Sequence, residues 1–273
     1  MSAFLFGAPG RAHLLDMGIV RRNMKKAIFI FPAFLLALPL AVFARDIIIA
    51  GAANVQFTLD DLTEEFIKET GIGIKTVIGS SGKLTSQIEN GAPFDLFLSA
   101  DMKYPATLYK EGFSLRSPKV YAYGGVVLWT MKDLDLTDIG VLSGSGIGKI
   151  ALADPEMAPY GRQAVNALKF YKLYDQLRKK FVLGESISQA NQFITTAAAD
   201  IGFTAKSIVL APNMKDKGKW IEVDPQSYEP IAQGVIVLRY AEQNHSKEAH
   251  EFYDFIFSAP AQGILKKYGY KLP

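Results

Sequence analysis

After residue 45 the chain alternates between short apolar runs and amphipathic segments. Compact β-branched runs are typical of buried strands, and apolar residues three and four apart are typical of helices. Strands that alternate with helices indicate an α/β fold with a parallel sheet. The pattern predicts strands at Asp46–Ala50, Gly73–Ile78 and Asp95–Ser99, and helices at Thr58–Thr70 (capped by Thr58), from Lys83, and around Tyr104–Glu111.

A second α/β unit is inserted into the first. Lys119–Thr130 is a long β-rich stretch with Gly124-Gly125 at its middle, which suits a strand that crosses between two domains. Ile231–Leu238 is also β-rich and is expected to cross back. We therefore predict lobe I at residues 45–123 and 236–273, and lobe II at residues 124–235. The remaining expected elements are strands at Lys149–Ala153, Ile201–Phe203 and Lys219–Val223, and helices at Arg162–Tyr174 (with Phe170 facing inward), Ser186–Ala198, Lys247–Phe257 and Ala261–Tyr268.

The apolar run before residue 45 has the features of a secretory signal. Met24-Lys25-Lys26 gives it a basic start, Ala27–Ala44 is uncharged, and its length with two prolines argues against a membrane anchor. We predict that residues 1–44, a signal peptide with an upstream extension, are removed and that the mature protein begins near Arg45. With no Cys to carry a lipid, we expect the protein in a Gram-negative periplasm.

The positive charge of the chain belongs to this leader. Residues 1–44 contain five basic residues and one acidic residue, a net +4, so the total of +3 leaves −1 for residues 45–273. The mature protein therefore has no basic excess of the kind that favours nucleic acid or a membrane surface.

Small and polar residues gather where strands pass into helices. Two serines and two glycines occupy Gly79–Gly82, directly before a helix that begins near Lys83. The first N–H groups of a helix lack partners, and the helix dipole favours negative charge there, so hydroxyls at this point can help to seat an anion. An ordinary serine N-cap is the alternative role for the same residues.

Similar loops recur at Ala53-Asn54, Pro159–Gly161 and Glu185–Ile187. Ligands of open α/β sheets bind beyond the carboxyl ends of the strands, so two sheets that face each other would form a cleft with donors on both sides. Donors without acceptors favour a fully deprotonated oxyanion, since a phosphate that keeps a proton also needs an acceptor.

Four blocks of the mature chain carry a resemblance to the periplasmic molybdate-binding proteins of ABC importers. They are IIIAGAANVQFTLDDL at Ile47–Leu62, GSSGKLTSQIENGAPFDLFLSAD at Gly79–Asp101, ALADPEMAPYG at Ala151–Gly161, and YGYKLP at Tyr268–Pro273. The resemblance implies a two-lobed periplasmic-binding-protein fold of type II-like topology, each lobe being a mostly parallel sheet flanked by helices. It also implies molybdate or tungstate as the ligand and an inner-membrane permease with its ATPase as the partner of a monomeric protein.

The same resemblance assigns ligand-binding positions. The oxygens of the molybdenum oxyanion would be held by Asn54, Ser81, Tyr160 and Ile187, and support is expected from Ala53, Ser80, Gly82 and Ala205. Some members of the family add a tyrosine hydroxyl at the position of Ala205, whose side chain cannot donate. The Asn54 amide is a candidate for that missing donor.

Two alternatives stay open at this stage. Ser80-Ser81-Gly82-Lys83 matches the S-x-x-K motif of serine enzymes, in which Lys83 would activate Ser80, although the S-D-N and K-T-G motifs that accompany it are absent. Sulfate or another tetrahedral oxyanion would fit the same donors and differ only in size. His245 and His250 have no metal-site motif around them. We expect a binding protein without catalysis or a cofactor, and no nucleic-acid partner.

Overall fold

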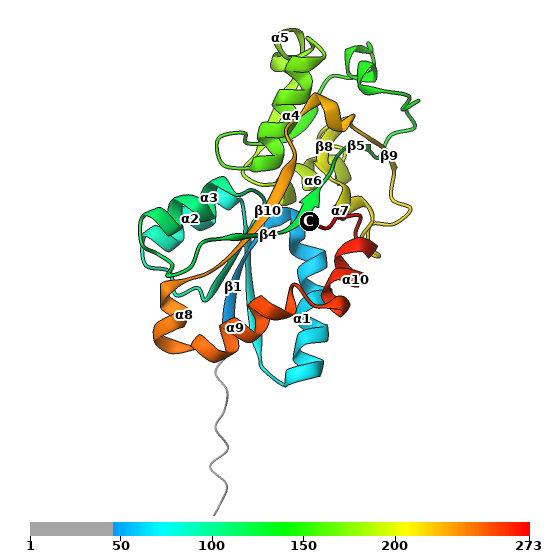
Figure 1. Ribbon diagram of the computed structural model, residues 1–273. Coiled ribbons are helices and arrows are strands. Elements are labelled where there is room, and N and C mark those ends of the chain that lie inside the picture. The colour runs from blue at the N-terminus through cyan, green and yellow to red at the C-terminus, as the bar shows by residue number, and fades with distance from the viewer. Residues whose placement is uncertain (1–45) are drawn as a thin grey trace, which may run out of the picture. The chain divides into compact units, whose positions relative to one another are not determined.

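The computed structural model describes residues 46–273, so the predicted signal at residues 1–44 lies outside the described part. A first five-stranded sheet has the order β2-β1-β3-β10-β4. Its strands β1, β4 and β10 are labelled in Figure 1. Strand β1 is parallel to β2 and β3, as predicted, whereas β10 is antiparallel to β3 and β4. The strands are β1 at Ile47–Ala52, β2 at Ile74–Gly79, β3 at Leu96–Ser99, β4 at Lys119–Gly124 and β10 at Ile231–Val237.

Side chains that alternate along these strands give the first sheet two buried faces. Ile47, Ile49 and Leu98 pack with one group of helices, and Ala50 and Phe97 pack with another. The first group is α1 at Gln56–Thr70, α9 at Ser246–Phe255 and α10 at Ala259–Lys267, and the second is α2 at Ser81–Glu89 and α3 at Lys103–Lys110.

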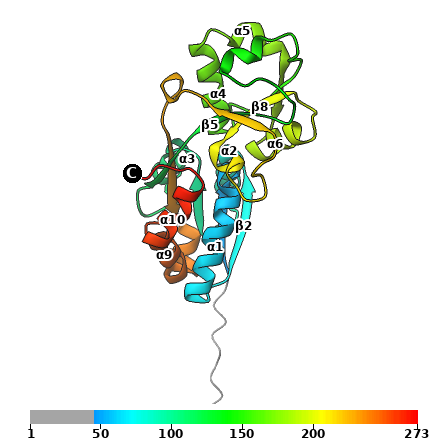
Figure 2. The same cartoon turned by 90° about the vertical axis from the view of Figure 1, so that its right-hand side faces the viewer.

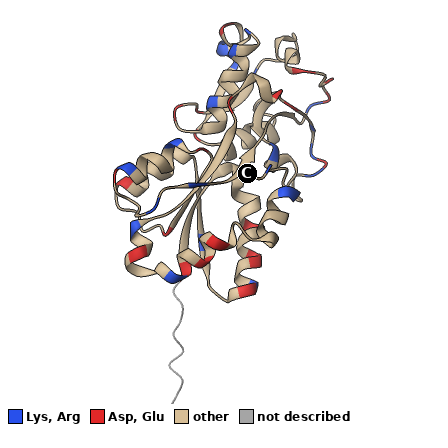
Figure 3. Cartoon of the chain, viewed as in Figure 1, with Lys and Arg blue, Asp and Glu red and all other residues tan. Residues whose placement is uncertain are grey.

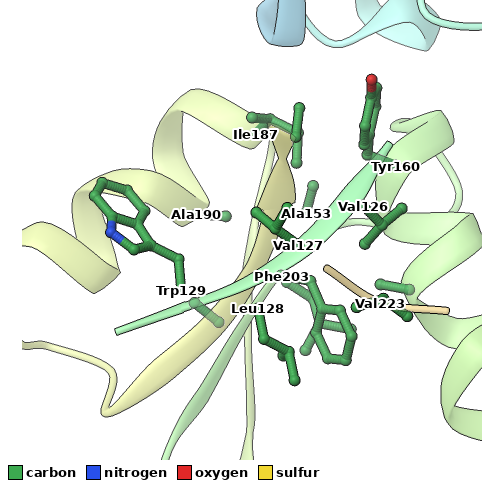
Figure 4. Close-up of a cluster of buried hydrophobic side chains, with 14 of the residues drawn as sticks. Val126, Val127, Leu128, Trp129, Ala153, Tyr160, Ile187, Ala190, Phe203 and Val223 are labelled. Atoms are coloured by element: carbon green, nitrogen blue, oxygen red, sulfur yellow. The ribbon is translucent and has the colours of Figure 1, made fainter. Parts of the chain in front are cut away.

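A second five-stranded sheet has the order β7-β6-β8-β5-β9. Trp129, Val127 and Phe203 from its strands lie in one buried cluster (Figure 4). Strand β6 is parallel to β7 and β8, and β5 is antiparallel to β8 and β9. Its elements are β5 at Val126–Thr130, β6 at Ile150–Ala153, β7 at Phe181–Gly184, β8 at Ile201–Ala205, β9 at Lys219–Glu222, α4 at Pro159–Phe170, α5 at Tyr174–Leu177, α6 at Ile187–Thr195 and α7 at Lys206–Val209.

The chain passes from the first sheet to the second at the glycine pair. Strand β4 ends at Gly124 and β5 begins at Val126, so Gly125 is the link between the sheets. The return occurs before Ile231, because Ile231–Val237 pairs with the first sheet along its whole length. The lobe boundary expected between residues 235 and 236 therefore falls inside β10.

Several local expectations were wrong. Thr58 is not a cap, because the 3₁₀ turn η1 at Ala53–Val55 runs directly into α1 and the helix begins at Gln56. Phe170 is exposed at the end of α4 rather than turned inward. Strand β7 and helix α8 at Arg239–Asn244 were not predicted. Among the described helices, none has the length and apolarity that a membrane crossing requires.

Candidate functional site

The starts of four helical segments meet at one small cavity. The segments η1 and α2 come from the first sheet, and α4 and α6 come from the second; in Figure 2, α4 and α6 lie above α1. The cavity has a volume of about 10 Å³, which is close to the space that one water needs. It is lined by Ala52, Ala53, Asn54, Ser80, Ser81, Ala100, Ala158, Pro159, Tyr160 and Ile187.

The Ser81 hydroxyl is oriented by the backbone of the neighbouring strand end. Ser81 is fully buried at the first position of α2, and its Oγ accepts the N–H of Ala100 at 3.0 Å. Because the Oγ lone pair is used in this way, the hydroxyl proton is available to an acceptor in the cavity. Ser80 has the capping role, since its Oγ accepts the N–H of Lys83 at 3.4 Å.

Asn54 is buried and its amide is already engaged. Its Nδ2 donates to Gln233 Oε1 at 2.8 Å and to Tyr270 Oη at 2.9 Å. Both amide hydrogens therefore point into the protein, and the amide is not the free donor that the sequence suggested. The donor that Asn54 can offer the cavity is its main-chain N–H, in the first turn of η1, where no intrahelical acceptor exists.

Tyr160 and Ile187 lie in the first turns of α4 and α6. Pro159 opens α4 at a position where its missing N–H is harmless, and Ser186 caps α6 by accepting the N–H of Gln189 at 3.4 Å. Figure 4 shows Tyr160 and Ile187 at one edge of the second sheet's core. Their main-chain N–H groups come before the first i to i−4 bond, so they have no acceptor within their helices.

The phenol of Tyr160 is buried, and its hydroxyl has no hydrogen-bond partner within the described residues. Burial raises the pKa of Tyr160 well above the ordinary tyrosine value, and the phenols of Tyr270 and Tyr121 raise it further. The hydroxyl therefore keeps its proton throughout the physiological range.

Two of the expected supporting residues lie outside the lining. The N–H of Gly82 donates to Met157 O at 2.9 Å, so it closes a contact with the loop before α4. Ala205 is fully buried in β8 and pairs with Val126. The lining adds residues that the sequence did not single out, namely Ala52, Ala100, Ala158 and Pro159. Three of these are alanines, which provide space and so give no side-chain signal.

No lining residue carries a charge. The nearby ionic groups are paired with one another: Arg162 Nη1 lies 2.9 Å from Asp101 Oδ2, and Lys83 pairs with Glu185. Residues of both signs occur across the helices and loops (Figure 3). Any negative ligand in the cavity would be held by aligned N–H groups and a hydroxyl rather than by a cation.

Comparison with known proteins identifies the family to which this fold belongs. Residues 47–271 match the family described as bacterial extracellular solute-binding protein. The chain belongs to this family.

Two relatives of this solute-binding protein are similar over most of their length. The molybdate-binding protein ModA of Azotobacter vinelandii is 36% identical, over 85% of this chain and 92% of the relative. ModA of Rhodobacter capsulatus is 34% identical, over 87% of this chain and 93% of the relative. The solved periplasmic molybdate-binding protein of Azotobacter vinelandii superposes with a TM-score of 0.79 at 34% identity, covering 84% of this chain and 100% of that one. The predicted two-lobed α/β architecture and the predicted family are confirmed.

The structure also accounts for the motifs of the serine-enzyme alternative. Lys83 pairs with Glu185 and donates its main-chain N–H to Ser80 Oγ, so Ser80 and Lys83 are already used in helix capping and in an ion pair. His245 Nδ1 lies 2.9 Å from Asp95 Oδ1, and His250 Nε2 lies 3.0 Å from Glu242 Oε1, so each histidine is paired with one carboxylate. The described residues contain no group of three His, Asp or Glu side chains placed to hold a metal ion. The family and the molybdate-binding relatives show that this chain is an extracellular solute-binding protein and not an enzyme, and that it acts outside the cytoplasm.

Proposed function

We propose that this protein captures molybdate, and tungstate with it, in the cleft between its two lobes and delivers the anion to an ABC permease and its ATPase in the inner membrane. The observation that carries the proposal is the convergence of four helix starts on one uncharged, buried cavity. Relatives named for molybdate binding, which share this architecture, support the choice of anion.

The proposed contacts are the Ser81 hydroxyl and the main-chain N–H groups of Asn54, Ser81, Tyr160 and Ile187. Each is a donor at the start of a helical segment. A dianion without protons can accept from all of them at once, whereas a protonated phosphate would turn one O–H towards this set of donors and would need an acceptor such as Asn54 Oδ1, which is unpartnered within the described part of the chain. The donor set therefore suits molybdate, tungstate or sulfate better than phosphate, and the size of the cavity in the ligand-bound state would separate the larger anions from sulfate.

Binding would close the protein around the ligand. The two lobes already contact each other beside the cavity, where Tyr104 Oη donates to Glu156 O at 3.0 Å and Ser188 Oγ donates to Gln56 Oε1 at 2.6 Å. The anion could enter only if these contacts opened, with Gly124-Gly125 and the return segment before Ile231 as the hinge. A ligand that touches both lobes favours the closed state, which is the form a permease would recognise.

Titration calorimetry of the purified protein with molybdate, tungstate, sulfate and phosphate tests the function. We expect heat and tight binding for the first two anions and little response to the others. Tight sulfate binding would support the cleft as the binding site but would assign the protein to a sulfate importer. Failure of all four anions to bind would contradict the transport function.

The finer points of location and assembly are part of this proposal. We propose that residues 1–44 are cleaved on export to the periplasm and that the mature protein is a monomer. Intact-mass measurement of protein secreted by a Gram-negative host should give a chain that begins near Arg45. Light scattering of the same sample should give the mass of a single chain; a dimer, or an uncleaved leader, would contradict the respective point.

A further inference from the structure

A closed ring of hydrogen bonds lies directly behind Asn54. Asn54 Nδ2 donates to Tyr270 Oη at 2.9 Å, Tyr270 Oη donates to Ser207 Oγ at 3.1 Å, and Ser207 Oγ donates back to the main-chain oxygen of Asn54 at 2.7 Å. All three residues are at least nine-tenths buried. The ring thus fixes both the side chain and the peptide group of a residue in the cavity wall.

The three members of the ring come from different parts of the protein. Asn54 belongs to η1 beside the first sheet, Ser207 belongs to α7 beside the second, and Tyr270 follows α10 near the end of the chain. Tyr270 is held in place because Lys271 exchanges two main-chain hydrogen bonds with Tyr123, at 2.7 and 3.0 Å. The end of the chain is therefore fastened to β4, next to the glycine pair where the chain changes sheets.

Gln233 extends the ring to the second anion contact. Its Oε1 accepts the other Asn54 amide hydrogen at 2.8 Å, and its Nε2 donates to Ala100 O at 3.3 Å. The N–H of Ala100 in turn donates to Ser81 Oγ at 3.0 Å. The buried Gln233 side chain therefore connects Asn54 with Ser81 through Ala100, the residue that follows β3.

We propose that Tyr270 and Gln233 are positioning residues of the anion site, which hold Asn54 and Ser81 in fixed positions relative to each other. The side chain of Asn54 anchors the residue, and its main-chain N–H binds the ligand. The inference rests on the proposed binding of an oxyanion in this cavity. By this inference the terminal Tyr268–Pro273 segment supports ligand binding through Tyr270, and Ser207 connects Asn54 to the second sheet.

Burial keeps the ring in one protonation state. It raises the pKa of Tyr270 to about 12, so the phenol remains a donor to Ser207 in the physiological range. The phenol proton has two acceptors, Ser207 Oγ and the main-chain oxygen of Asn54 at 3.2 Å, and with either one Tyr270 Oη still accepts from the Asn54 amide.

Two variants and a matched control test the inference by molybdate titration of the purified protein. Tyr270→Phe and Ser207→Ala each break the ring and should weaken molybdate binding about three- to tenfold, which corresponds to one net hydrogen bond. Tyr121→Phe is the control, because Tyr121 is equally buried near Tyr270 but its hydroxyl has no partner among the described residues. It should bind molybdate as the wild type does.

A double variant separates positioning from general loss of stability. If Tyr270 acts through the Asn54 side chain, adding Tyr270→Phe to Asn54→Ala should cost less affinity than Tyr270→Phe costs in the wild type, because the bonds to the main-chain oxygen of residue 54 are all that remain to be lost. The inference would be overturned if the fold-loss of affinity in the double variant equalled the product of the two separate fold-losses. It would also be overturned if Tyr270→Phe bound molybdate as tightly as the wild type. A wild-type protein that binds no molybdate would instead overturn the proposed function, and this result is available before any variant is made.

Discussion

The hydroxyl of Tyr160 occupies the place that a β-carbon on Gly124 would take. Tyr160 belongs to α4 of the second unit, and Gly124 is the last residue of β4 in the first sheet. The same missing β-carbon leaves room for Gln233 Nε2, which a side chain at residue 124 would approach to 3.1 Å. Gly124 is thus needed for close approach of the two lobes, in addition to any freedom that it gives the hinge.

Gly124→Ala should weaken molybdate binding and destabilise the closed form. The added methyl group overlaps a buried phenol, and such overpacking costs about 1–3 kcal/mol. Gly125→Ala is the matched control, because a β-carbon there would meet Lys206 at an ordinary 3.7 Å. Titration calorimetry of both variants checks the prediction, and adding Tyr160→Phe to Gly124→Ala should restore part of the lost affinity. Equal affinities for the two alanine variants would contradict it.

Ser81→Ala should reduce the free energy of molybdate binding by about 1.5–3 kcal/mol, the range for a hydrogen bond to a charged group. Ser80→Ala should instead lower the free energy of unfolding by about 1 kcal/mol, because Ser80 caps α2. Molybdate titration and urea unfolding of both variants separate the two roles. If Ser80→Ala weakened molybdate binding and Ser81→Ala did not, the anion contact would be assigned to Ser80 instead.

The Asp101–Arg162 ion pair should slow release of the ligand. It joins the segment after β3 to α4, with its two atoms 2.9 Å apart and both side chains mostly buried. Arg162→Met removes the charge, keeps the apolar stem, and should raise the molybdate dissociation rate about fivefold, or about 1 kcal/mol. Lys132→Met breaks the Lys132–Asp200 pair, whose partners both lie in the second unit, and should leave that rate unchanged. Stopped-flow release experiments measure both rates, and identical changes would exclude a closing role.

Sequence periodicity was sufficient for the elements that bury one clear face. The helix with Leu59, Leu62 and Phe66 on one side and the buried strand before it were predicted because local burial determines them. Strand β7 was missed because Phe181 and Val182 are only half-buried and Leu183 is exposed at the edge of the second sheet. The early start of α4 was missed because Pro159-Tyr160-Gly161 has loop composition, although proline suits the first position of a helix.

For the site too, residues that stand out in their own loops could be predicted, whereas contacts between residues far apart in the sequence could not. Asn54, Ser81, Tyr160 and Ile187 were singled out from their own loops and by resemblance, and the structure brings all four to one cavity. Their contacts with an anion remain a prediction. The partners of Asn54 could not be predicted, because Gln233 and Tyr270 lie 179 and 216 residues away along the chain. Only the fold brings these residues together.

Buried phenols should make the protein sensitive to alkali. Burial raises the pKa of Tyr121 and Tyr160 well above the ordinary value and that of Tyr270 to about 12, whereas a tyrosine in the unfolded chain ionises near 10. Above about pH 10 the unfolded chain therefore loses protons that the folded chain keeps. The free energy of unfolding should fall as pH rises from about 10 to 12, by about 1.4 kcal/mol per pH unit for each such phenol.

Urea unfolding across this pH range, with phenolate absorbance recorded in parallel, measures that fall. Tyr121→Phe should make it shallower, because one buried phenol no longer ionises on unfolding. Tyr109→Phe, at an exposed position, should not alter the slope. Below about pH 10 every phenol is protonated in both states, so stability there should not depend on the tyrosines. Titration of all twelve tyrosines near pH 10 in a protein that stays folded would contradict this account, since it would mean that the phenols behind the anion cavity are open to water.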